Sequence, residues 1–212
     1  MMVVIILTAF LKTVISCPSD SCFCRGKTTV DCSFRGFEDI PQFRGEKIRY
    51  SVMDLSRNHL SFIGPNSFEN VDAKTVNFSR NRLINVSPRA FNGPIRNSLQ
   101  TLNLRYNPLS ILHWAVFRRM SKLNRILLDH NNFFTIPVGL FDDNHGLEEL
   151  SLAHNRISLL KTDSFRGLVS LSILNFKDNR LKEILDNTFL HLAKLHTLDL
   201  SGNHLSVLKP GK

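Results

Sequence analysis

Two histidines, His130 and His154, are the residues of this chain whose type and spacing come nearest to a reactive site. They occupy equivalent positions, 24 residues apart, in an internal repeat, so we expect them to lie side by side. Imidazole is a common metal ligand, but a zinc site needs three or four protein ligands. We count no carboxylate and no third histidine beside the pair at that position, so we expect surface histidines and predict no metal site.

The chain lacks the sequence motifs of several large enzyme classes. It contains no P-loop, no GxSxG elbow and no HExxH pair. Glu148 and Glu149 are adjacent on an expected strand, so their side chains diverge, which suits charge display better than paired acid–base catalysis. We therefore predict that the chain is not an enzyme and that it uses no cofactor.

All four cysteines, Cys17, Cys22, Cys24 and Cys32, lie near the N-terminus. An even count next to an export signal favours disulfides, and an oxidising compartment argues against the alternative of a zinc site. A Cys22–Cys24 bridge is strained by its close spacing, which leaves two of the three possible pairings.

The first 16 residues are typical of a secretory signal peptide. Val3 to Leu11 form an apolar core, and the small residues Val14 and Ser16 precede a cleavage site before Cys17. The alternative is a membrane anchor, but Lys12 interrupts the apolar run well short of the ~20 residues that span a bilayer. No later segment is long and apolar enough to cross a membrane, so we expect an exported chain without a transmembrane segment.

Most of the chain follows one repeated pattern. From Leu147 it reads LEELSLAHNRI, with apolar residues at places 1, 4, 6 and 11 and Asn at place 9. The copies begin at Tyr50, Ala73, Leu99, Leu123, Leu147, Leu171 and Leu195. The ninth place is always Asn: Asn58, Asn81, Asn107, Asn131, Asn155, Asn179 and Asn203. The nineteenth place is Phe in every complete copy: Phe68, Phe91, Phe117, Phe141, Phe165 and Phe189.

Each place of this pattern that recurs from copy to copy has a physical role. The L-x-L alternation predicts a short strand with one buried face, and one copy cannot bury its leucines without stacked neighbours. The Asn amide both donates and accepts hydrogen bonds, so a column of Asn satisfies buried backbone groups in successive turns. The Phe column fills the outer side of the coil.

The cysteine run CPSDSCFCRGKTTVDC and the repeats of about 24 residues resemble the N-terminal cap and typical repeats of animal extracellular leucine-rich repeat proteins. Slit proteins, Toll-like receptors and lamprey variable lymphocyte receptors belong to this group. The resemblance implies an α/β-type leucine-rich repeat solenoid, a horseshoe with a parallel concave β-sheet, a mostly loop or short-helix convex side and a disulfide-bonded N-terminal β-hairpin cap. It also implies the bridges Cys17–Cys24 and Cys22–Cys32.

The domain organisation follows from these segments. We predict a signal peptide at 1–16, a cysteine-rich cap at 17–49 and about seven repeats at 50–212. The second repeat, 73–98, is longer than its neighbours, and the extra residues fall at 93–97. The last repeat is incomplete, which leaves its leucines uncovered and favours a fragment, with a capping partner or an end-to-end dimer as alternatives.

Ligand binding is expected on the concave sheet, where places 2, 3, 5, 7 and 8 of each repeat point outward. These places combine aromatic, arginine and apolar residues, which is the composition of an interface core. The predicted ligand-binding residues are Arg80, Arg105, Tyr106, Arg125, Leu127, His130, Glu149, His154 and Ile173. Positive residues gather in the first four repeats and negative ones in the last three, so a ligand would bind in one orientation. The alternative is a solvated face with scattered apolar residues.

These features predict an extracellular protein-recognition module of the receptor, adhesion or matrix, or innate-immunity type. The formal net charge of +9 supports an alternative, a matrix protein that binds heparan-type glycans through its basic surface. Nucleic-acid binding is not predicted, because no base-reading motif accompanies the basic residues. Asn77 and Asn85 begin glycosylation sequons, and we expect fuller use of Asn77 because Pro88 follows the second sequon.

Overall fold

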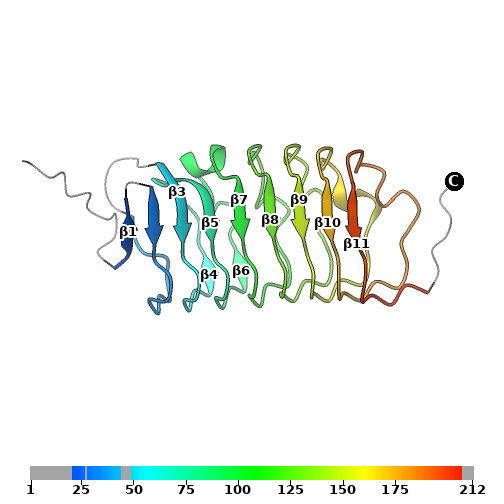
Figure 1. Cartoon of the computed structure of the whole chain (residues 1–212), viewed down its shortest axis with the longest axis horizontal. Helices are drawn as coiled ribbons and strands as arrows, with labels where there is room; N and C mark the ends of the chain where they lie inside the picture. The colour runs from blue at the N-terminus through cyan, green and yellow to red at the C-terminus, as the bar shows by residue number, and fades with distance from the viewer. Residues whose placement is uncertain (1–20, 27, 44–48, 207–212) are drawn as a thin grey trace, which may run out of the picture.

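The computed structural model describes residues 21–26, 28–43 and 49–206. They form a row of stacked turns along one long axis, with a nine-stranded sheet running from end to end (Figure 1). The strand order is β1-β2-β3-β5-β7-β8-β9-β10-β11, and every pair from β2 onward is parallel. The seven repeat strands are β3 (Arg49–Asp54), β5 (Asp72–Asn77), β7 (Thr101–Asn103), β8 (Arg125–Leu127), β9 (Glu149–Ser151), β10 (Ile173–Asn175) and β11 (Thr197–Asp199). Each includes places 3 to 5 of its repeat, as the alternation predicts.

The N-terminal cap is a hairpin that protects the first edge of the sheet. Strand β1 (Phe23–Arg25) pairs antiparallel with β2 (Thr29–Asp31), and β2 pairs in parallel with β3. Cys22 and Cys32 form the disulfide that the family resemblance implies. Cys24 is also disulfide-bonded, but its expected partner Cys17 and the signal peptide lie outside the described residues.

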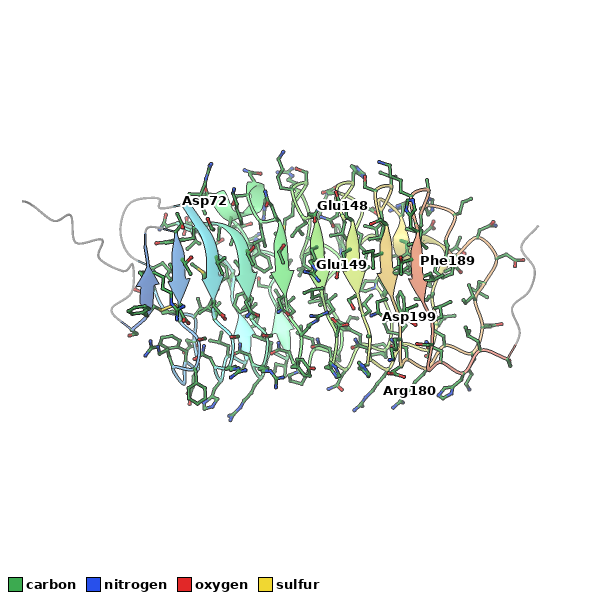
Figure 2. All side chains as sticks on the ribbon, viewed as in Figure 1. Asp72, Glu148, Glu149, Arg180, Phe189 and Asp199 are labelled. Carbon is green, nitrogen blue, oxygen red and sulfur yellow. A yellow bond between two sulfur atoms is a disulfide. The ribbon has the colours of Figure 1, made fainter. Side chains whose placement is uncertain are left out.

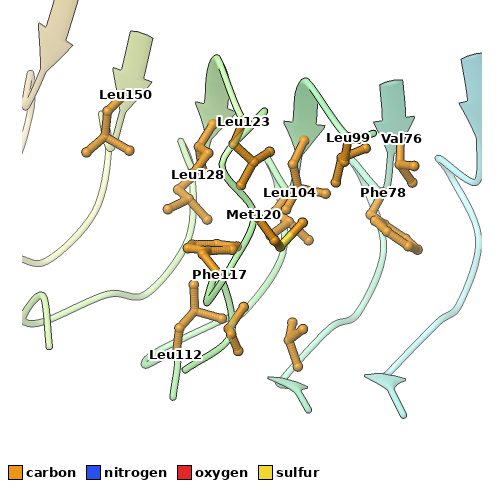
Figure 3. Packing of buried hydrophobic residues seen from close by; sticks show 14 of the residues in the cluster. Val76, Phe78, Leu99, Leu104, Leu112, Phe117, Met120, Leu123, Leu128 and Leu150 are labelled. Atoms are coloured by element: carbon orange, nitrogen blue, oxygen red, sulfur yellow. The ribbon is translucent and has the colours of Figure 1, made fainter. Parts of the chain in front are cut away.

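The core is a set of repeated layers. Leucines, isoleucines and valines from the sheet side meet the phenylalanines of the nineteenth place, as Figure 3 shows for Leu128, Phe117 and their neighbours. The rings of Phe117 and Phe141, one turn apart, stack with centroids 6.1 Å apart. Complete burial of each such side chain contributes roughly 1.5–3 kcal/mol, so the stacked layers are the main source of stability.

The ninth-place asparagines form a buried ladder. Asn131 accepts a hydrogen bond from the N–H of Leu109 at 3.2 Å, and its Nδ2 donates to the carbonyls of Leu104 and Leu128 at 3.0 and 2.9 Å. Asn107 and Asn155 make equivalent bonds one turn away on each side. The amide therefore bonds backbone groups of adjacent turns that water cannot reach.

The convex side is mostly loop. Within the described residues it contains no α-helix, only the 3-10 helices η1 (Pro94–Asn97) and η2 (Thr162–Phe165) and a small sheet of β4 (Phe62–Ile63) and β6 (Asn85–Val86). The extra residues of the second repeat form η1, which is anchored by the buried Ile95. The described segments hold no helix with the length and apolarity that a membrane crossing requires.

Burial decreases at the last described turn. Leu174 on β10 is fully buried, whereas Leu198, at the same place on β11, is 38% exposed. Leu195, Leu200 and Leu205 of this turn are only half-buried. The layer that the sequence analysis expects to be uncovered is therefore exposed to solvent.

Candidate functional site

The turn that follows each strand places one residue in the left-handed backbone region. In most repeats an Asn or Asp at the fifth place begins this turn, because its Oδ1 accepts the N–H of the seventh residue, as Asn103 does from Arg105 at 3.1 Å. The eighth residue then has a positive φ in every repeat: 55° at Arg57, 59° at Arg80, 56° at Tyr106, 55° at His130, 54° at His154, 53° at Asp178 and 69° at Gly202. Side chains of the eighth place are thus held in one orientation along the edge where the strands end.

Five consecutive eighth-place side chains contact one another in a row, and we call them the eighth-place ladder: Arg80, Tyr106, His130 and His154 stack, and Asp178 pairs with His154. The Arg80 guanidinium carbon lies 4.5 Å from the centre of the Tyr106 ring. Ring centroids are 4.2 Å apart between Tyr106 and His130, and 4.1 Å apart between the two histidines. Nδ1 of His154 is 3.2 Å from Oδ2 of Asp178. The expected contact between the histidines is confirmed.

An open hollow of about 250 Å³ lies along the ladder. Arg105, Asp129 and Lys177 from the seventh places line it together with the ladder rings. Nε of Arg105 lies 2.5 Å from Oδ2 of Asp129, and this carboxylate also accepts a hydrogen bond from the Ser151 hydroxyl. The carboxylate of Asp129 is thus neutralised within the sheet, while the ladder forms the solvent-facing rim.

Burial and nearby positive charge make His130 harder to protonate. Its pKa lies below the usual value of 6.5 because partial burial disfavours the charged ring, and because His154 opposes a second positive charge. Asp129 raises the pKa in part, whereas Arg105 and Arg80 lower it further. His130 is therefore an uncharged ring at neutral pH, and it lies in the ladder between the Arg80 guanidinium and the Asp178 carboxylate.

Leu127 is not the exposed apolar residue that the sequence analysis predicts, because it is only 5% exposed. Arg125 and Asp129 stand on either side of it along the same strand face. Arg125 pairs with Glu149 on one neighbouring strand at 2.8 Å, and Asp129 pairs with Arg105 on the other side. Leu127 therefore lies between two ion pairs and contributes to the core rather than to the exposed face.

Other predicted binding residues lie on the open sheet but outside the ladder. Arg125 and Glu149 are half-exposed and paired, and Figure 2 shows Glu149 in the middle of β9. Ile173, at the third place of the next repeat, is 41% exposed. The ion pairs of Arg105 with Asp129 and of Arg125 with Glu149 reduce the expected separation of charge along the sheet, because the sequence analysis counted both arginines as free positive groups.

The structure adds residues that the sequence analysis missed. Asp178 follows His154 in the ladder, a carboxylate neighbour that was not counted, although no group of three or more His, Cys, Asp or Glu in the described part of the chain is arranged to hold a metal ion. Phe34, in the cap, has a φ of 53° and is 82% exposed. Its N–H bonds to the carbonyl of Ser56 as eighth-place residues do in the repeats. The sequence Thr29-Val30-Asp31-Cys32 resembles a repeat strand, and this is the signal that could have indicated Phe34.

The two sequon asparagines differ in their surroundings. Asn77 is half-buried on β5, where its Oδ1 accepts the N–H of Ser79 and its Nδ2 donates to Asp54 at 3.2 Å. Asn85 is exposed on β6. The structure therefore favours Asn85 as the more accessible acceptor, in contrast to the preference expected from the sequence.

The comparison with protein families identifies the repeat. Leucine rich repeat profiles match residues 51–71, 72–133, 121–181 and 145–205, which together cover most of the chain. The eighth-place ladder lies within these matches.

Relatives and solved structures share the repeat but are much longer. Leucine-rich repeat-containing protein 3 of Danio rerio is 32% identical over half of this chain and 40% of its own length. The structure of the TLR13–ssRNA13 complex matches with a TM-score of 0.73 and 25% identity over 77% of this chain and 23% of the other. The Drosophila Toll–Spatzle complex matches with a TM-score of 0.61 and 24% identity over 74% of this chain and 24% of the other, which shows the shared fold. The chain spans less than half of each of these proteins.

Proposed function

Because the chain belongs to the leucine-rich repeat family, we propose that it is an extracellular recognition module that binds a protein ligand along the eighth-place ladder and the sheet beside it. The observation that carries this proposal is the unbroken series of contacts from Arg80 to Asp178, four stacked side chains followed by an ion pair. Receptor ectodomain, adhesion or matrix, and innate-immunity roles all fit such a module, and the ladder does not select among them.

The ladder has the properties of a binding hot spot. Tyr106 is 41% exposed, yet its ring is held between Arg80 and His130, so little side-chain freedom remains to be lost on binding. Aromatic and arginine side chains dominate the affinity of protein interfaces. A rigid, exposed aromatic column is therefore suited to anchor a protein surface.

The ladder also gives the ligand a direction. Its first side chain is a cation, Arg80, and its last is an anion, Asp178, although the histidine next to Asp178 pairs with it. Inside the hollow, Arg105 and Asp129 neutralise each other. A ligand with acidic residues at one end and basic residues at the other would bind in one orientation, and its association would be faster at low salt.

The test is a binding screen of the secreted chain, fused to an antibody Fc, against purified extracellular protein domains. For any domain that binds, we expect Tyr106→Ala to raise the dissociation rate at least tenfold, because it removes the central anchor. Arg80→Ala should mainly lower the association rate. Leu127→Ala should act through loss of stability, since its side chain is buried.

A control that removes positive charge outside the ladder tests whether loss of binding is specific to the ladder residues. Arg156 and Arg180 are exposed and lie two places after ladder residues, and Figure 2 shows Arg180 beyond the end of β11. Arg156→Gln and Arg180→Gln should leave binding within about twofold of wild type. If the control weakens binding as much as Tyr106→Ala does, the ladder is not the binding site.

A further inference from the structure

A second site lies on the convex side, where four arginines surround one open hollow. Arg89, Arg96, Arg118 and Arg119 line this hollow together with Asn92, and its volume is about 520 Å³. None of the residues that line it is acidic or aromatic. Four cations around one cavity repel one another, so an anion bound between them would stabilise the arrangement.

The repeat stacking and the inserted residues of the second repeat bring these arginines together. Arg89 comes from the second repeat, and Arg118 and Arg119 come from the corresponding segment of the third. Arg96 belongs to η1, the inserted helix that Figure 1 shows at the upper edge, where β5 and β7 begin. The ladder lies at the other end of the strands, so the two sites are separate.

Most of the positive charge at this site is not neutralised by the protein. Over the described residues, the side chains of Arg89, Arg96 and Arg119 have no ion pair. Among the described residues, Asp143 is the one carboxylate within ion-pair distance of the group: its Oδ2 lies 3.8 Å from Nε of Arg118 and also accepts the backbone N–H of Arg119 at 2.8 Å. The Arg118 guanidinium covers the Trp114 ring.

Arg96 provides a second and independent indication of a ligand. Its terminal nitrogen donates to Asn92, but its Nε is buried and has no hydrogen-bond partner. A buried donor without an acceptor is unfavourable. Because this Nε has almost no accessible surface, the guanidinium of Arg96 would turn toward the hollow for a bound oxyanion to accept from it.

Arg119 has a backbone conformation that disfavours any residue with a side chain, so the presence of arginine there indicates a functional role. Its φ is 60°, and the equivalent residues of the second and fifth repeats are Gly93 and Gly167, with φ values of 103° and 93°. A side chain in this region is disfavoured, and such outliers concentrate at functional sites. The third repeat has arginine where a glycine would be less strained.

We propose that this hollow binds the sulfate groups of a sulfated glycan chain. Arginine forks hold tetrahedral oxyanions through paired N–H donors, which suits sulfate. An open hollow admits a chain passing over the surface, whereas an enclosed pocket would be needed for a small isolated anion. Single-stranded nucleic acids need aromatic platforms for their bases, and the lining has none. The site is independent of the protein-binding ladder.

The test is calorimetric titration of the full chain with a heparin hexasaccharide at physiological ionic strength. The double variant Arg89→Gln/Arg119→Gly should weaken binding about tenfold, since two charge-assisted contacts are removed. Glycine at position 119 relieves the backbone strain, so the melting temperature should be unchanged or higher. The control Arg156→Gln/Arg180→Gln makes the same charge change and should alter affinity less than twofold.

Titrations with two other ligands determine which class of ligand the hollow binds. A fully desulfated hexasaccharide should not bind, and a single-stranded RNA hexamer should bind more weakly than the sulfated glycan. Equal losses in the double variant and its control would overturn the site and indicate diffuse charge attraction. RNA binding that is tighter than heparin binding and sensitive to the double variant would overturn the sulfate assignment. Tyr106→Ala, which tests the ladder, should leave heparin binding unchanged.

Discussion

Replacement of Asn131 by alanine should destabilise the protein severely, because this residue holds the turn that carries His130. Its amide makes one accepted bond, from Leu109, and two short donated bonds, to Leu104 and Leu128. All of these groups are buried, and Asn131 is only 6% exposed. The Leu109 N–H would be left without a partner, at a cost of roughly 1–3 kcal/mol. The two carbonyls keep hydrogen bonds from Asn107 and Asn155, so each lost bond to them costs roughly 0.5–1.5 kcal/mol and the total is about 2–6 kcal/mol. That is a large part of the ~5–15 kcal/mol that stabilises a typical domain.

Urea denaturation followed by circular dichroism measures this effect. With an m-value of about 3 kcal/mol/M, the upper end of the usual range for urea, the midpoint should fall by roughly 0.7–2 M. Because solenoids unfold in parts, the melting of the ladder region should also be followed by the fluorescence of Trp114, in the third repeat. His130 and Tyr106 should lose their fixed stacking in the same variant.

Asn203 is the matched control, since it makes the same bonds at the last described turn. Its Nδ2 donates to Phe176 and Leu200, and its Oδ1 accepts from Leu181, but it is only half-buried. Water can replace the amide there, so Asn203→Ala should cost only about 1 kcal/mol. Equal effects at the two positions would refute the reasoning, because they would show that desolvation of the partner groups does not set the cost.

Three other predictions concern protonation, covalent links and glycans. The pKa of His130 is lowered in the folded state, so its contribution to stability is present above its unfolded pKa of about 6.5 and is lost as pH falls through its folded pKa. The free energy of unfolding should therefore fall less between pH 7 and pH 5 in His130→Gln than in the wild type, as measured by thermal denaturation. Peptide mapping of the secreted protein without reduction should recover a second bridge, from Cys24 to Cys17, whereas a free thiol at either residue would contradict the predicted pairing. Site-resolved mass spectrometry of protein from animal cells should find Asn85 more fully glycosylated than Asn77, because the Asn77 amide is held by Asp54, and the reverse ratio would show that Pro88 controls sequon use.

The repeat architecture could be predicted from the sequence because its buried residues recur in every turn. A phenylalanine at place 19 meets another phenylalanine one turn away, as Phe117 meets Phe141, so the same residue type satisfies each layer. The asparagine at place 9 likewise bonds the same backbone groups in each turn. Successive repeats are copies of one unit, each displaced along the long axis of the molecule. This displacement predicts the strand register, the parallel sheet and the contact between His130 and His154.

The exposure of surface residues could not be predicted in the same way. Alternation states which face a side chain points to, but not whether neighbours cover it. Leu127 is buried although alternation places it on the outer face of the sheet. The ion pairs of Arg125 and Asp129 on either side of it depend on which charges stand in adjacent repeats. The fifth-place asparagines are half-buried for a related reason, because their side chains bond to the turn itself rather than to solvent or ligand.

The sequence by itself determined the fold of this protein, its stacked core and the columns in which its surface residues stand. Only the tertiary structure decided which columns form sites: the left-handed turn that orients the eighth-place ladder, and the inserted helix η1 that brings Arg96 to Arg89, Arg118 and Arg119. The physical reason is that core contacts repeat with the unit and can be read from one copy. Contacts between surface side chains depend on the particular residues of neighbouring turns and on local backbone geometry, so they appear only when the turns are stacked in space.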